Sequence, residues 1–118
     1  MEPIDRVDRL RARLAAFVEE RDWDQFHNPK NLAMALAAEA GELLEHFQWL
    51  SAEEAARLPP DVRREVALEM ADILLFLLRL SDKLGVDLLA AAENKLEINR
   101  KKYPVEKAKG RATKYTKL

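Results

Sequence analysis

Cysteine is absent from this 118-residue chain, and glycine and long apolar runs are scarce. Without cysteine there is no disulfide, no thiolate nucleophile and no cysteine-ligated zinc or iron–sulfur site. The longest apolar run, residues 32–38, is far shorter than the ~20 residues that a membrane-spanning helix needs. The N-terminus mixes acids and bases and lacks the apolar segment of a signal peptide. We therefore expect a soluble, cytoplasmic protein with no membrane partner.

Charge is distributed unevenly along the chain, although the formal net charge is only −1. Residues 39–72 carry nine acids and three bases, whereas residues 95–118 carry nine bases and two acids. This asymmetry predicts an acidic site followed by a basic C-terminal segment. Basic residues do not dominate the whole chain, as they do in nucleic-acid-binding domains, so we expect no nucleic-acid partner.

Leu, Ala, Glu, Arg and Lys dominate the composition, which is typical of helices. Apolar residues recur every three or four positions, and capping residues and prolines mark the boundaries between helices. The expected helices run from Pro3 and Ile4 to about residue 21, from Asn28 to about Leu50, between Ser51 and Pro59, from an Asp61 cap to Leu84, and from an Asp87 cap to Tyr103.

Residues 73–78 are apolar on every side of their helix. A helix of this kind is buried on all sides, and a small four-helix protomer would leave part of it exposed. We therefore predict an all-α, four-helix-bundle-type protomer that forms a homo-oligomer, either a dimer or a tetramer. The expected domain spans residues 1–104, and residues 105–118 form a basic arm.

Two pairs of acids stand beside apolar stripes on neighbouring helices. Glu39 lies at the edge of the stripe of the second helix, and Glu42 lies one turn further on the same face. Glu69 and Asp72 repeat this arrangement on the next long helix. If the two helices are antiparallel, four carboxylates converge and need a cation to offset their repulsion. Oxygen ligands select hard ions, which predicts Mg²⁺ or Mn²⁺.

One other interpretation of these acids is open, and a second is disfavoured. An acidic pair on a charged helix is commonly no more than a solvated face, and the chain would then be a non-catalytic helical interaction module. A di-iron carboxylate bundle is disfavoured because neither His27 nor His46 stands three residues after a glutamate.

Five segments of the chain, taken in their order and spacing, match the sequence pattern of a known protein family. They are ERDWDQFHNPKNL (20–32), EAGELLEHFQW (39–49), EMADILLFL (69–77), NKLEINRKKYP (94–104) and KYTKL (114–118). In this order and spacing they resemble the MazG-like all-α nucleoside triphosphate pyrophosphohydrolases, most closely the dCTP pyrophosphatase branch. The resemblance implies Mg²⁺-dependent hydrolysis of dCTP and modified dCTP to dCMP and pyrophosphate, with nucleotide-pool cleansing as the role. A broad-specificity (d)NTP pyrophosphatase is the alternative.

The resemblance also implies roles for particular residues. Glu39, Glu42, Glu69 and Asp72 would bind the metal and form the catalytic group, with one carboxylate as general base. Trp23, Asp24, Gln25, Phe26, His27 and Trp49 would form the base pocket. Independently of the resemblance, four residues recur every three or four positions along the last helix and its end, and beside four metal-binding acids they are candidate phosphate donors: Lys95, Asn99, Lys102 and Tyr103. Where relatives commonly carry a tyrosine this chain has Phe76, which can stack on a base but cannot form a hydrogen bond.

Each substrate-binding prediction has a structural alternative. Trp49 could be a core residue, and Trp23 could staple the end of a helix. His27 could be an exposed loop residue. The residues at 95, 99, 102 and 103 could form a solvated basic face.

Overall fold

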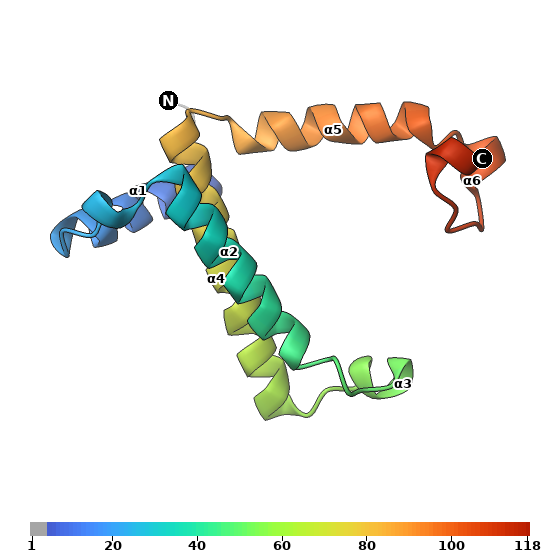
Figure 1. The fold of residues 1–118 in the computed structure, drawn as a ribbon, viewed down its shortest axis with the longest axis horizontal. Helices are drawn as coiled ribbons and strands as arrows, with labels where there is room; N and C mark the ends of the chain where they lie inside the picture. Colours follow the sequence, from blue (N-terminus) through green and yellow to red (C-terminus); the bar gives the residue numbers. More distant parts are fainter. Residues whose placement is uncertain (1–4) are drawn as a thin grey trace. The chain divides into compact units, whose positions relative to one another are not determined.

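The computed structural model describes residues 5–118, which form helices and turns with no β-strand in that range (Figure 1). The predicted all-α class is confirmed. Pro3 and Ile4, which the sequence prediction places in the first helix, lie outside the described residues. The chain divides into two compact units, one ending at Gly85 and one formed by Val86–Leu118. Among residues 5–118, no helix has the length and apolar character to cross a membrane.

The first unit is built on a pair of antiparallel helices, α2 and α4, with α1 packed against α4 (Figure 1). The short helix α3 lies in the connection between α2 and α4, at the end of the pair remote from α1 (Figure 1). The elements of this unit are α1 (Arg6–Glu20), the 3₁₀ turn η1 (Asp24–Phe26), α2 (Pro29–Glu45), α3 (Ala52–Ala55) and α4 (Pro60–Leu84).

Local capping explains where several of these helices begin and end. The Asn28 side chain accepts a hydrogen bond from the Asn31 N–H at the start of α2, as its sequence predicts. Ser51 and Glu54 form the expected capping box on α3. Gly85 ends α4 in the left-handed conformation, with φ 66°, which glycine adopts without a Cβ clash.

Two predicted boundaries are wrong. The cap of α4 is Pro59 rather than Asp61, because Pro60 occupies the first helical position, where no N–H is needed, and places Asp61 inside the first turn. Helix α2 ends at Glu45 rather than near Leu50, because its last turn tightens into hydrogen bonds between residues three apart. Trp49 therefore lies in a turn and not on the helix.

The apolar core of the first unit is small. Val18, Leu32, Val66 and Leu78 come from α1, α2 and α4 and are the buried hydrophobic side chains of the described residues. Many other apolar side chains on the same helices are exposed, among them Met34, Leu44, Leu68, Met70 and Leu74. Within residues 73–78 only Leu78 is fully buried, so the segment that is apolar on every side retains exposed surface.

The second unit consists of α5 (Leu88–Lys102), α6 (Val105–Ala108) and the 3₁₀ turn η2 (Tyr115–Lys117). The Asp87 side chain accepts a hydrogen bond from the Ala90 N–H and caps α5, as predicted. Tyr115 packs edge-on against Tyr103, with ring centroids 6.0 Å apart, and the Lys102 ammonium lies 4.6 Å from the Tyr115 ring centroid. The last residues of the chain therefore pack against the end of α5.

Candidate metal centre

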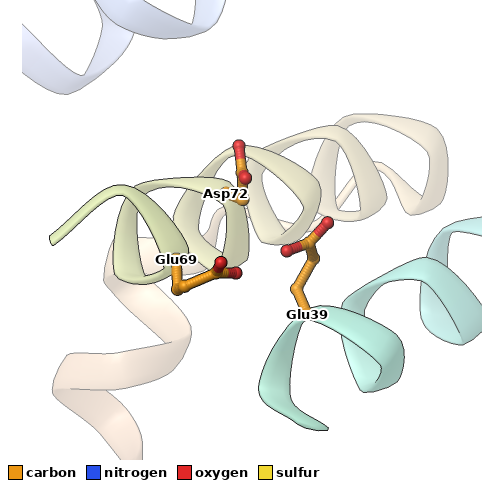
Figure 2. A group of neighbouring side chains, drawn as sticks. All are labelled: Glu39, Glu69 and Asp72. Carbon is orange, nitrogen blue, oxygen red and sulfur yellow. The ribbon is translucent and has the colours of Figure 1, made fainter. Parts of the chain in front are cut away.

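Helices α2 and α4 bring three of the four predicted acids together (Figure 2). Glu39 extends from α2 towards Glu69 and Asp72 on α4, and one carboxylate oxygen from each of the three lies within 4.8 Å of the others. The antiparallel packing of two helices, each with its acids on the facing side, produces this convergence. We call Glu39, Glu69 and Asp72 the acidic cluster.

Two carboxylate oxygens of the acidic cluster have no hydrogen-bond donor within the part of the chain that the structure describes. One oxygen of Glu39 and one of Glu69 are buried and accept no hydrogen bond. Burial raises the pKa of Glu39 to about 7, and the neighbouring Glu42, Glu69 and Asp72 carboxyls add to the effect. Buried oxygens without donors and a carboxyl that resists ionisation fit a hard divalent cation, which would supply the missing positive charge.

Glu42 and His46 flank the acidic cluster. Glu42 is exposed and lies outside the group of three, yet its carboxyl is close enough to contribute to the raised pKa of Glu39. The Nε2 atom of His46 lies 3.9 Å from a carboxylate oxygen of Glu69. The structure thus places all four predicted acids in one region, with Glu42 at its edge.

A cavity of about 300 Å³ adjoins the acidic cluster. Asp72 lines this cavity and also belongs to the cluster. Trp23 and Phe76 provide aromatic walls, and the Trp23 ring packs edge-on against Phe17 with centroids 5.6 Å apart. The other residues that line the cavity are Leu14, Phe17, Val18, His27, Leu75 and Arg79. We call this space the aromatic cavity.

Of the remaining residues predicted to form the base pocket, some lie at the aromatic cavity and others do not. Asp24 accepts hydrogen bonds from Arg79 and Lys83 beside the aromatic cavity. Gln25 donates to Asp22, and neither Gln25 nor Phe26 lines the cavity. His27 is half-buried and bonded to Arg79, so the alternative of a freely exposed loop histidine is wrong.

Trp49 stands apart from the aromatic cavity. Its side chain is 87% exposed and does not line that space. The alternative that Trp49 is a core residue of its own chain is therefore wrong. Its role against the substrate stays a prediction.

The predicted phosphate-binding residues belong to the second unit. Lys95 and Asn99 share one face of α5, and Lys102 and Tyr103 follow at its C-terminal end. Lys102 and Tyr103 both contact Tyr115. Their role against phosphate stays a prediction.

Comparison with known proteins decides the family. Residues 34–118, which include all four predicted acids, match the MazG-like family. This chain belongs to the MazG-like family.

The chain is similar to curated relatives and to a solved structure over most of their length. The chain is 42% identical to dCTP pyrophosphatase 1 of Mus musculus over 98% of this chain and 69% of the relative. It is 44% identical to the protein of the same name from Bos taurus, over 98% of this chain and 68% of the relative. A pyrophosphatase crystal structure from Archaeoglobus fulgidus matches with a TM-score of 0.83 and 36% identity, covering 88% of this chain and 97% of that one.

Sequence reasoning missed Arg79, Lys83 and His46 in this MazG-like chain. Arg79 interrupts an apolar run seven residues after Asp72, a spacing that returns to the same helix face. That spacing is a usable signal, because a lone charge on an apolar face needs a partner. The contact between His46 and Glu69 joins the turn after α2 to α4, and no local spacing in the sequence predicts it.

The raised pKa of Glu39 predicts how the metal-free protein responds to pH. Between the ordinary value of 4.5 and about 7, the folded state binds more protons than the unfolded state. The free energy of unfolding should therefore fall as pH rises through this window. We expect Glu39→Gln to remove most of that fall, measured by urea denaturation in the presence of a chelator. Glu45→Gln, on the same helix but outside the acidic cluster, should keep it. If the free energy of unfolding of Glu39→Gln falls with pH as steeply as that of the wild type, the raised pKa does not belong to Glu39.

Proposed function

We propose that this chain hydrolyses dCTP and modified dCTP to the monophosphate and pyrophosphate in the presence of Mg²⁺ or Mn²⁺. One observation carries the proposal, which is that Asp72 belongs both to the acidic cluster and to the lining of the aromatic cavity. A nucleoside triphosphate has the matching parts, with a cation-binding polyphosphate at one end and a flat base at the other. The identity of more than 40% to dCTP pyrophosphatases supports this choice of substrate.

Glu39, Glu69 and Asp72 are the ligands in this proposal, with Glu42 beside them. A bound Mg²⁺ would neutralise phosphate charge and polarise the phosphoryl group for attack by water. Glu42 lies at the exposed edge of the group, and we assign it as the general base that accepts the proton of the attacking water. Because three carboxylates are already held within 4.8 Å of one another, the chain orders the ligands before substrate arrives.

Trp23 and Phe76 would bind the base in the aromatic cavity by stacking. A base stacked on an aromatic side chain contributes roughly 1–3 kcal/mol to binding, largely independent of its identity. Phe76 has no hydroxyl group with which to read the edge of the base. This feature favours the second candidate, a broad-specificity (d)NTP pyrophosphatase, over strict selection of cytosine.

The test of the proposed function is pyrophosphate release from a panel of deoxy- and ribonucleoside triphosphates, including a methylated dCTP, with and without Mg²⁺. We expect dCTP or its methylated form to give the highest kcat/KM. Glu39→Gln should lower turnover by more than about a hundredfold, or ~2.7 kcal/mol of barrier, and weaken Mg²⁺ binding. Glu42→Gln should lower kcat while Mg²⁺ binding is retained. Absence of release from every triphosphate would instead support a non-catalytic interaction module.

Trp23→Ala tests the aromatic cavity as the base site. Loss of stacking should raise KM by an amount equivalent to roughly 1–3 kcal/mol, with kcat nearly unchanged, because the phosphates and metal keep their contacts. Phe26→Ala is the matched control, since Phe26 is a neighbouring exposed aromatic that does not line the cavity. Steady-state kinetics and a melting curve on both variants separate binding from stability. An equal rise in KM for the two variants would move the base site elsewhere.

We also propose that the chain forms a homo-oligomer, a dimer or a tetramer. Leu68 and Met70 on α4 are 68% and 58% exposed, and Met34 on α2 is 61% exposed. Apolar surface of this extent commonly marks an interface. Light scattering at micromolar concentration should give at least twice the monomer mass of 13.6 kDa. A stable, folded monomer would overturn this proposal.

A further inference from the structure

A buried arginine connects α4 to the segment that precedes α2. Arg79 is 7% exposed, and its guanidinium group makes two directed hydrogen bonds. Its Nε–H donates to Nδ1 of His27 at 3.2 Å, and Nη2 donates to Asp24 at 2.8 Å. A buried charge is stable only when paired and hydrogen-bonded, so these contacts define the position of the side chain.

Asp24 anchors this arrangement from the solvent side. It accepts a second hydrogen bond from Lys83 at 2.6 Å, and the hydrogen bonds from Lys83 and Arg79 lower the pKa of Asp24. The carboxylate therefore stays charged and keeps the guanidinium group oriented towards His27. Lys83 touches Asp24 but not His27, which makes it a natural control.

The hydrogen bond from Arg79 determines which nitrogen of His27 carries a proton. The arginine Nε always bears hydrogen, so Nδ1 of His27 has to accept with its lone pair. A neutral imidazole with an unprotonated Nδ1 carries its proton on Nε2. Burial, followed by the positive charge of Arg79, lowers the pKa of His27 and so also favours the neutral ring.

His27 lines the aromatic cavity together with Trp23 and Phe76. With Nδ1 engaged by Arg79, Nε2 is the ring nitrogen left for a ligand. We propose that Arg79 is a positioning residue that holds His27 as the Nε2–H tautomer, so that the cavity presents a fixed hydrogen-bond donor to an acceptor atom of a pyrimidine base. The tautomer stands on the geometry alone, whereas the base as its acceptor rests on the proposed function.

Tautomer-sensitive NMR of protein with isotope-labelled histidine tests the first part without any substrate. The chain has only two histidines, and His46→Gln assigns their signals. We expect neutral, Nε2-protonated His27 in the wild-type protein at neutral pH. A predominantly Nδ1-protonated or cationic ring would overturn the proposal whether or not any variant folds.

Arg79→Met removes the donors and keeps a long apolar side chain in the buried position. We expect a mixture of His27 tautomers and a rise in the KM for dCTP of about tenfold, the scale of one lost hydrogen bond, with kcat within about twofold. Lys83→Met should leave the tautomer and KM as in the wild type. If Arg79→Met does not fold, Arg79→Lys, which keeps the charge but lacks the guanidinium fork, should show the same changes.

The outcomes separate this inference from the proposed function. An unchanged tautomer in Arg79→Met, or a changed tautomer with an unchanged KM, would overturn the positioning role of Arg79. Absence of activity in the wild-type protein would overturn the proposed function and the base as acceptor. The NMR comparison would still decide the tautomer in that case.

Discussion

Repulsion between carboxylates across the α2–α4 pair is the main force that the packing of the first unit has to overcome. Glu39 and Glu69 each keep a buried oxygen without a donor, and the pKa of Glu39 is raised to about 7. Like charges held this closely oppose the packing of the two helices that carry them. The apolar contacts of the pair hold it together against this opposition, and a divalent cation would convert the repulsion into attraction.

Helix α4 sets the distance between the two parts of the candidate site. Its rise of about 1.5 Å per residue places Arg79 roughly 15 Å along the axis from Glu69, with Asp72 and Phe76 between them. Asp72, Leu75, Phe76 and Arg79 follow one another at helical spacing along the aromatic cavity. One continuous helix thus carries Glu69 and Asp72 of the acidic cluster near its middle and residues that line the aromatic cavity further on.

The polar network at the aromatic cavity complements its aromatic walls. Trp23 and Phe76 offer faces that any base can stack on, and stacking discriminates little between bases. Discrimination needs a donor or an acceptor of known direction, and Phe76 supplies none. The chain of hydrogen bonds from Asp24 through Arg79 to His27 supplies a directed group on the wall of the same cavity.

Helices, caps and acidic pairs depend on neighbours within a few residues. The sequence by itself therefore determined the start of α2 at Asn28, the capping box at Ser51, the end of α4 at Gly85 and the two pairs of acids. Only the tertiary structure decided that Glu42 stands outside the closest group and that Trp49 is exposed. It also decided the hydrogen bonds of Arg79 to His27 and Asp24, partners 52 and 55 residues away along the chain. Helical periodicity shows which residues share a face, but packing between distant helices selects what that face meets.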